Sequence, residues 1–217
     1  EKQTNQISCD ELLEQAYEES PLNNFEKNKF KDLFLNRYPE FDLMFEEAAQ
    51  ETGIEKNLLA AISFQESQWD PRAQSNMGVR GMMMVTLETA ALVGVEKRLN
   101  PEQNIKGGAK YFAMLKEKNI VGETEADQLS TVLASYNLGP TNINKIASQI
   151  NSDVQTVSWT EIREKLKVIK GSELNLVDRE SYSRGQQAID YVDRVKSYYQ
   201  LLSAHSCIAP KDQLIFF

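Results

Sequence analysis

The hexapeptide Glu66–Pro71 places a carboxylate at the end of an apolar run, Leu58–Gln65, that has helical character. On a helix of 3.6 residues per turn, Leu59, Ile62 and Glu66 are spaced i, i+3 and i+7 and so share one face. Glutamate is rarely buried unless it is paired or has a function. The spacing alone supports two interpretations equally. Either Glu66 bends out to solvent, or it is half-buried and the pKa of its carboxyl rises toward that of a general acid.

A proline and a glycine-punctuated turn follow this carboxylate. Pro71 is expected to stop the helix, because proline lacks an N–H and disfavours helix at the residue before it. The segment Ala73–Met84 contains two glycines three residues apart, Gly78 and Gly81, and ends in three methionines. Such glycines indicate unusual backbone dihedral angles or a close approach of the backbone to a ligand. The methionines are suited to lining an adaptable groove, although a run of methionines is more often core.

A second apolar helix is predicted to end in a similar way. The segment Leu133–Ser135 leads into Tyr136 and Asn137, and a Gly139-Pro140 break follows. The helix would therefore present an aromatic hydroxyl and an amide just before the chain turns.

These motifs resemble the soluble-lytic-transglycosylase (SLT) domain family. The matching positions are Glu66, Ser67, Trp69, Pro71, Ala73, Ser75, Gly78, Gly81 and Met82. Gly107–Phe112 is similar to the family's G-x-x-Y-hydrophobic segment, and Ser135–Gly139 is similar to its A-Y-N-x-G motif. The order and spacing agree over residues 45–200.

Within the family, the chain is most similar to the membrane-bound lytic murein transglycosylase F type. This likeness rests on Gly78–Met84 and on Tyr182–Gly185 ahead of Tyr191. The chain departs from the usual pattern at Met84, where the family has glutamine, and at Gln187, where glutamate is common. The first departure removes one hydrogen bond that would face the sugar.

The resemblance implies a mainly α, lysozyme-like (goose-type/SLT) domain that cleaves peptidoglycan between N-acetylmuramic acid and N-acetylglucosamine. Glu66 would protonate the glycosidic oxygen and then accept the proton of the muramoyl 6-hydroxyl, which gives a 1,6-anhydro product. Glycosidases usually need two carboxyls, but no second carboxylate occupies a motif position. Asp70 is expected in a turn beside Pro71, and Glu88 is expected on a solvent face. A single-acid mechanism without cofactor or metal is therefore favoured.

The resemblance also implies a set of substrate-binding residues: Ser75, Gly78, Met82, Met84, Tyr136, Asn137, Tyr182 and Tyr191. Among them, Tyr136 and Asn137 would orient Glu66 or the acetamido group of the sugar. Each tyrosine also has a purely structural interpretation, as a core residue whose hydroxyl finds a partner. Trp69 is expected to be a core anchor beneath the site.

Two alternative functions differ from this expectation in their chemistry. A goose-type-lysozyme-like hydrolase would share the fold and the acid but would activate a water, and so would need a second carboxylate. A non-catalytic peptidoglycan-binding module would keep only the fold. The presence of Glu66, Ser75, Tyr136 and Asn137 argues against such a module, which has no need of a buried glutamate.

Length and composition fit one soluble domain with an appendage. The chain has 217 residues, 41% hydrophobic and 26% charged, and no apolar run long enough to span a membrane. Its formal net charge of −8 argues against nucleic acid as a partner, because phosphate binding needs clustered Lys and Arg. The chain starts at Glu1 without a signal sequence, so we expect a processed form or a fragment.

Two cysteines near the ends, Cys9 and Cys207, have no metal-binding spacing, and the chain has one histidine, His205. They are interpreted with equal weight as a disulfide in an exported protein or as two unrelated free thiols. The resemblance to F-type enzymes implies a periplasmic, envelope-associated location. It also implies a regulatory solute-binding-like domain that is missing from this chain.

Helices are predicted almost throughout, with an N-terminal helical extension over 1–40, a catalytic domain over 41–205 and a tail over 206–217. A capping box is predicted at Thr52–Glu55, ahead of the helix that carries Glu66. Pro101 and Asn104 are expected to introduce a helix that reaches Lys118. Lys167–Ile169 and Leu214–Phe217 are the two short strand candidates.

Overall fold

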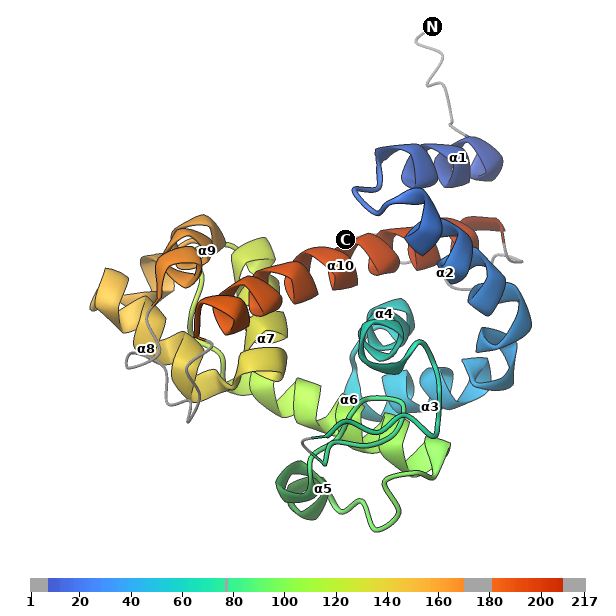
Figure 1. Ribbon diagram of the computed structural model, residues 1–217, viewed down its shortest axis with the longest axis horizontal. Coiled ribbons are helices and arrows are strands. Elements are labelled where there is room, and N and C mark those ends of the chain that lie inside the picture. Colours follow the sequence, from blue (N-terminus) through green and yellow to red (C-terminus); the bar gives the residue numbers. More distant parts are fainter. Residues whose placement is uncertain (1–7, 77, 170–180, 209–217) are drawn as a thin grey trace, which may run out of the picture. The chain divides into compact units, whose positions relative to one another are not determined.

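The computed structural model describes residues 8–76, 78–169 and 181–208. Ten α-helices lie in these ranges (Figure 1): α1 Cys9–Glu19, α2 Asn24–Asn36, α3 Asp42–Thr52, α4 Lys56–Ser67, α5 Leu87–Val93, α6 Pro101–Lys118, α7 Glu125–Leu138, α8 Pro140–Ile150, α9 Trp159–Val168 and α10 Ser181–Ile208. Two short 3₁₀ helices, η1 Tyr38–Glu40 and η2 Val154–Thr156, join them. No strand occurs within the described ranges, where extended pairing is limited to isolated bridges. The predicted mainly α fold is confirmed.

The chain folds into two compact units. The first comprises residues 1–106 and 195–217, and the second comprises residues 107–194. The predicted boundaries at residues 40 and 205 stay predictions. Of the predicted tail, residues 206–208 belong to α10, and the remainder lies outside the described residues.

An aromatic cluster forms much of the core of the first unit. Phe30 of α2 is fully buried and stacks on Tyr198 of α10, with ring centroids 5.5 Å apart. Its ring also meets Phe64 of α4 edge-on at 5.0 Å and lies 5.8 Å from Trp69. Aromatic pairs at such distances stabilise a core beyond the area they bury. Helix α2, from the predicted N-terminal extension, is therefore built into the core that supports α4.

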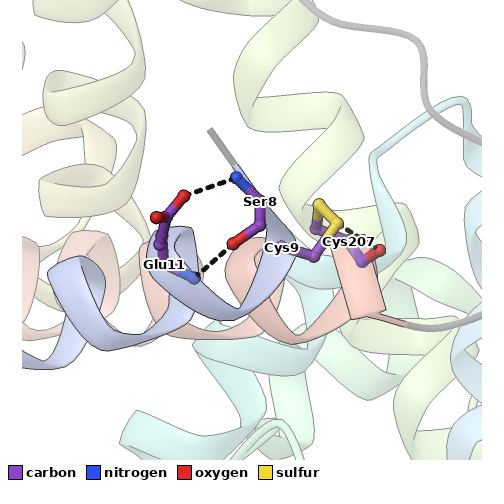
Figure 2. The surroundings of a disulfide bond; sticks show 4 residues. All are labelled: Ser8, Cys9, Glu11 and Cys207. Atoms are coloured by element: carbon purple, nitrogen blue, oxygen red, sulfur yellow. Dashed lines mark hydrogen bonds between the residues drawn. A yellow bond between two sulfur atoms is a disulfide. The ribbon is translucent and has the colours of Figure 1, made fainter. Parts of the chain in front are cut away.

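Helix α1 is attached differently, because none of its residues is buried. A capping box begins the helix, in which the Glu11 N–H donates to Ser8 Oγ at 3.2 Å and the Ser8 N–H donates to the Glu11 carboxylate at 2.8 Å (Figure 2). A disulfide joins Cys9 to Cys207 at the end of α10. The attachment of α1 to the first unit thus depends strongly on this covalent link.

We expect reduction of this disulfide to lower the melting temperature by about 10 °C. Closing a loop of 198 residues would stabilise the fold by at most about 5 kcal/mol in the chain-entropy model. Because only half-buried residues hold α1 once the disulfide is reduced, we expect about 3 kcal/mol. Thermal unfolding with and without a reductant measures the change. A Cys9→Ser, Cys207→Ser variant serves as control and should not respond to the reductant. Equal melting temperatures of the oxidised and reduced wild type would contradict the prediction.

His205 makes the second attachment of α1. Its Nε2 lies 3.0 Å from the Tyr17 hydroxyl, and its ring stacks on Phe34 of α2 at 4.2 Å. Burial lowers the pKa of His205 from its usual 6.5, and the positive charge of Lys31 lowers the pKa further. The folded protein therefore favours the neutral imidazole.

We expect the first unit to lose stability as the pH falls through 6.5. A histidine with a lowered folded-state pKa binds fewer protons in the folded than in the unfolded state. Its contribution is therefore complete above the unfolded-state pKa and is lost toward the lower folded-state pKa. Melting temperatures between pH 7.5 and 5.5 should fall in the wild type and fall less in His205→Gln. An equal decline in the two proteins would assign the pH dependence to other groups.

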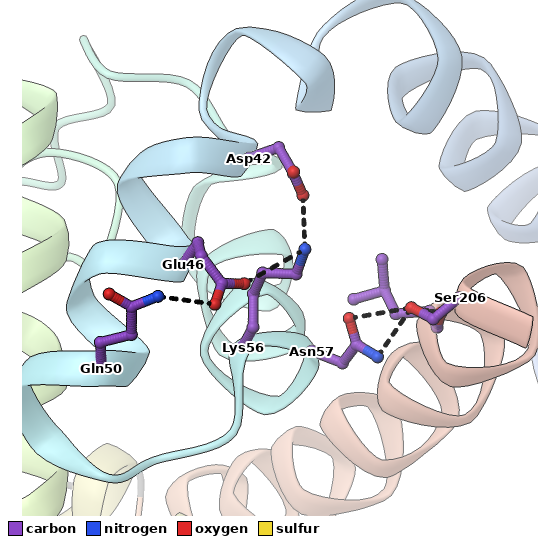
Figure 3. A network of polar contacts seen from close by, with 7 residues as sticks. Asp42, Glu46, Gln50, Lys56, Asn57 and Ser206 are labelled. Carbon is purple, nitrogen blue, oxygen red and sulfur yellow. Dashed lines mark hydrogen bonds and ion pairs between the residues drawn. The ribbon is translucent and has the colours of Figure 1, made fainter. Parts of the chain in front are cut away.

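Polar contacts hold the first turn of α4 in place (Figure 3). Lys56 Nζ lies 3.1 Å from the Asp42 carboxylate and 3.6 Å from that of Glu46, both on α3. Asn57 Nδ2 donates to Ser206 Oγ of α10 at 2.9 Å. The helix that carries Glu66 is thus tied at its start to two other helices of the first unit.

The predicted capping box at Thr52–Glu55 is wrong. Thr52 is the last residue of α3, and its hydroxyl donates back to the Ala48 carbonyl at 2.7 Å. Gly53 adopts a left-handed conformation, with φ of 69°, and caps that helix. A glycine in this conformation ends helices readily. Helix α4 instead begins after Glu55 without a side-chain cap.

The second unit is built around α7, which packs against α8 and α9. The Asp127 carboxylate accepts the N–H of Trp159 at 2.7 Å, and Arg163 pairs with Asp193 at 2.7 Å. The predicted strand at 167–169 is wrong, because Lys167 and Val168 complete α9. A strong capping box at the start of α9 favours helix over this segment. The other strand candidate, Leu214–Phe217, lies outside the described residues.

None of the described helices combines the length and the apolar character that crossing a membrane demands.

Candidate active site

Glu66 occupies the last turn of α4, at the point where this helix leaves the core. The preceding residues 58–64 are all buried, and Leu59 and Ile62 have no exposed surface. Glu66 itself is half-buried. The helix thus carries a carboxylate from the interior to the edge of the first unit.

The chain turns sharply after Glu66, through two consecutive non-glycine residues in left-handed conformations. Gln68 has φ of 56° and Trp69 has φ of 58°. The left-handed Gln68 ends α4 at Ser67, four residues before the proline that was expected to end it. Such backbone costs about 1–2 kcal/mol per residue. A strained backbone of this kind persists only where surrounding contacts enforce it, and such strain often occurs at functional sites. The turn therefore marks this region as a candidate functional site.

Several contacts offset that cost. Arg37 donates to the Gln68 carbonyl at 3.0 Å. The indole N–H of Trp69 donates to the Ala60 carbonyl at 2.9 Å, and its ring is fully buried. The prediction of Trp69 as a core anchor is confirmed. Asp70 accepts the N–H of Arg72 at 2.9 Å, which confirms its expected role in a turn.

The glycine-rich loop, residues 73–85, follows this turn. Residue 77 lies outside the described part of the chain. Ser75 donates its N–H to Val79 at 3.1 Å, and Gly81 donates to Ala73 at 2.8 Å. Isolated bridges pair Arg80 with Gln74 and with Val85. The loop therefore folds back on itself as a compact structure, in which Ser75 is half-buried and Gly78 is exposed.

Two serines of α4 hold the loop to the helix of Glu66. Ser63 Oγ and Ser67 Oγ both donate to the Met82 carbonyl, at 3.0 Å and 2.8 Å. The side chains of Met82 and Met83 are fully buried, so these two methionines are core. Met84 is half-buried and has φ of 47°. Met82 therefore contacts α4 through its backbone carbonyl, while its side chain lies in the core.

Three residues that organise this loop were not predicted as site residues: Ser63, Arg98 and Asn104. Arg98 donates to the carbonyls of Gly78 at 2.6 Å and Val85 at 3.2 Å. The predicted helix from Pro101 to Lys118 is confirmed as α6. Asn104 lies near its start, and its side chain turns to the loop. The sequence offered a signal for Ser63, which is a polar residue inside an otherwise apolar helical run.

In the second unit, Tyr136 and Asn137 lie in the last turn of α7, as predicted. Tyr136 is half-buried, with its ring 5.6 Å from Tyr111 and 6.1 Å from Phe112, and Asn137 is exposed. Gly139 has φ of 93° and Pro140 opens α8, so the predicted break is present.

The remaining predicted residues lie on α10. Tyr191 is buried, with 4% of its surface exposed. Tyr182 lies in the first turn of the same helix. Glu66, Ser75, Gly78, Met82 and Met84 thus belong to the first unit, and Tyr136, Asn137, Tyr182 and Tyr191 belong to the second. The substrate-binding roles of both groups stay predictions.

Within the described ranges, no three His, Cys, Asp or Glu residues are grouped closely enough to hold a metal ion.

Comparison with known proteins places this site in a family. The profile of the Transglycosylase SLT domain matches residues 43–156. A membrane-bound lytic murein transglycosylase F 1 of Alkalilimnicola ehrlichii is 41% identical over 170 residues, which are 77% of this chain and 34% of the relative. A membrane-bound lytic murein transglycosylase F of Maricaulis maris is 40% identical over 172 residues, or 78% of this chain and 37% of the relative.

A solved structure shows the same fold. This is an inactive mutant of lytic transglycosylase Slt from Pseudomonas aeruginosa, with a TM-score of 0.56 and 18% identity over 94% of this chain and 31% of that one. The chain therefore spans about a third of the length of the proteins it matches.

Proposed function

Because this chain belongs to the transglycosylase SLT domain family, we propose that it is the catalytic part of a lytic murein transglycosylase. Its substrate would be peptidoglycan, cut at the β-1,4 bond between N-acetylmuramic acid and N-acetylglucosamine. The observation that carries the proposal is Glu66 itself. Glu66 is half-buried and lies in the last turn of α4, after the buried residues 58–64. It also lies inside the family match.

In the proposed reaction Glu66 acts first as an acid and then as a base. Its carboxyl proton passes to the glycosidic oxygen as the C1–O bond breaks, and the acetamido group of the substrate stabilises the positive charge at C1. The resulting carboxylate accepts the proton of the 6-hydroxyl while O6 bonds to C1. This sequence leaves a 1,6-anhydro-muramoyl end, consumes no water and returns Glu66 to its protonated form. One group serving both steps works best when its pKa is near the working pH.

The surroundings of Glu66 support a single carboxyl in this role. Asp70, four residues on, is engaged in a turn with the Arg72 N–H. Glu88 lies on α5 with its side chain exposed. Glu88 therefore lacks the half-buried setting of Glu66, whereas Asp70 is also half-buried but lies beyond the end of α4. A hydrolase that activates water would instead need a second carboxylate on the opposite face of the sugar.

Mass spectrometry of the products released from purified sacculi tests the proposal. Anhydro-muropeptides, each lighter by one water than the corresponding reducing product, are the expected result. Reducing ends would instead identify a muramidase of the goose-type-lysozyme kind. Binding to sacculi without any release would indicate a peptidoglycan-binding module. Either of these outcomes would overturn the proposed transglycosylase.

We also propose a location and a partner for the longer protein. The matched relatives are named membrane-bound, and about two thirds of their length lies outside the match. We therefore infer action at the cell envelope, on the periplasmic side, together with a further domain of regulatory function. Comparing product release by this chain and by the longer protein tests the partner. Equal rates and equal products would contradict regulation.

A further inference from the structure

Asn104 is a buried polar side chain of the first unit that plays no part in the proposed chemistry. Its amide oxygen and its amide nitrogen are both hydrogen-bonded. It lies in the first turns of α6 and has no exposed surface. Its Oδ1 accepts the Met83 N–H at 2.7 Å, and its Nδ2 donates to the carbonyls of Arg80 at 2.9 Å and Arg98 at 2.8 Å. A buried amide that makes three bonds to backbone determines the path of that backbone, because each broken bond would leave a buried group unpaired.

The backbone around Asn104 is built to accept it. Gly81 has φ of 82°, and a Cβ at this position would lie 2.5 Å from Asn104 Nδ2 and would overlap the Arg98 carbonyl oxygen. The Asn104 amide therefore occupies space that only a glycine leaves open. Asn104 and Gly81 form one packing unit, which sets the direction of the glycine-rich loop between Arg80 and Met83.

This unit connects directly to the helix of the proposed acid. Met82, between the bonded residues 80 and 83, gives its carbonyl to Ser63 and Ser67 of α4. Ser63 precedes Glu66 by three positions, so the two side chains are neighbours on the helix surface, and Ser67 directly follows Glu66. Contacts thus run from Asn104 through the loop backbone to the turn of α4 that carries Glu66.

We infer that Asn104 is a positioning residue, whose amide fixes the glycine-rich loop against the turn of α4 that bears Glu66. It touches neither substrate nor reacting atoms and acts through the loop backbone. The inference rests on the proposed function for its effect on rate, whereas its effect on the loop is independent of any reaction. Displacement of a reacting group by about 1 Å can cost about 100-fold in rate, so a loosened loop should be visible in the kinetics.

Hydrogen exchange of the substrate-free protein tests the structural part. In the wild type, the Met83 amide should exchange slowly, because its N–H is buried and bonded to Asn104. In Asn104→Ala, peptides covering residues 79–85 should exchange about 10-fold faster, as expected for the loss of one backbone hydrogen bond. A Met83 amide that already exchanges like an exposed loop amide in the wild type would overturn the inference.

Asn57→Ala is the matched control, because it removes a half-buried amide contact from α4 in the same unit without touching the loop. Its lost partner is Ser206 on α10. This variant should lower the melting temperature while leaving exchange over residues 79–85 unchanged. Faster exchange of the loop in both variants would assign the effect to general loss of stability and overturn the role of Asn104.

Turnover on sacculi tests the functional part, at a temperature where all the variants are folded. Asn104→Ala should lower kcat about 100-fold, whereas Asn57→Ala should keep kcat near the wild-type value. A folded Asn104→Ala protein with wild-type kcat would overturn the inference. If Asn104→Ala does not fold, Asn104→Asp replaces it, since this variant keeps an acceptor for the Met83 N–H and loses the donor to the two carbonyls. Absence of turnover in the wild type would refute the proposed function, and the exchange measurements would still decide how the loop is held.

Discussion

Replacing Glu66 by Gln should reduce the release of anhydro-muropeptides by at least about 1000-fold, while the protein stays folded. A positioned general acid contributes about 100- to 10,000-fold in rate. In the proposed reaction Glu66 serves in both proton transfers, and no other carboxyl is assigned to either, so the loss should fall in the upper part of that range. Glutamine keeps the size of the side chain and its hydrogen-bonding capacity, but it cannot give up a proton and take it back. Glu66 is half-buried, and a glutamine side chain fits the same space, so the melting temperature should change little.

Glu88→Gln provides the control for this experiment. Glu88 is an exposed carboxylate on α5, and its replacement makes the same change in net charge. That variant should release products at the wild-type rate. The assignment of Glu66 as the acid fails if Glu66→Gln cleaves sacculi nearly as fast as the wild type. It also fails if the two variants lose activity equally, because net charge would then explain the loss.

The sequence alone predicted which helix face Glu66 shares, but it left open whether the side chain is half-buried or bends out to solvent. Its spacing from Leu59 and Ile62 predicted one buried face, and the structure buries both apolar residues completely. This prediction succeeded because a helix turns the spacing of residues directly into a spatial arrangement. The break at Gly139-Pro140, which follows the end of α7, was predictable from the local sequence, because glycine and proline punctuate helices.

The arrangement of the glycine-rich loop could not be predicted in this way. Its path depends on Asn104, more than twenty positions away, and on two serines of α4. The identity of an asparagine shows that it can form hydrogen bonds, but not which backbone groups it will meet after folding. The false capping box at Thr52 is a local example of the same limit. A neighbouring glycine, Gly53, ends the preceding helix and so removes Thr52 from the start of the next one.

Replacing Gly81 by Ala should destabilise the protein by about 4 kcal/mol. An L-residue held at φ of 82° costs about 1–3 kcal/mol. Crowding by an added methyl group in a packed region costs about 1–3 kcal/mol more. Here the methyl group would meet the Arg98 carbonyl oxygen and the Asn104 amide, which is itself held by three hydrogen bonds. Neither neighbour can withdraw as the end of a flexible side chain would.

Gly94→Ala separates the two causes. Gly94 caps α5 with φ of 77°, close to the value at Gly81, but an added Cβ there meets nothing within 4 Å. This variant should lose only the cost of the dihedral angle, about 1–2 kcal/mol. The difference between the two variants, about 2–3 kcal/mol, measures how firmly Asn104 and the Arg98 carbonyl are held around Gly81. Chemical denaturation of both variants and the wild type gives this difference. Equal destabilisation would mean that the loop yields to the new methyl group, and a loop that yields so easily could not hold the turn of Glu66 in place.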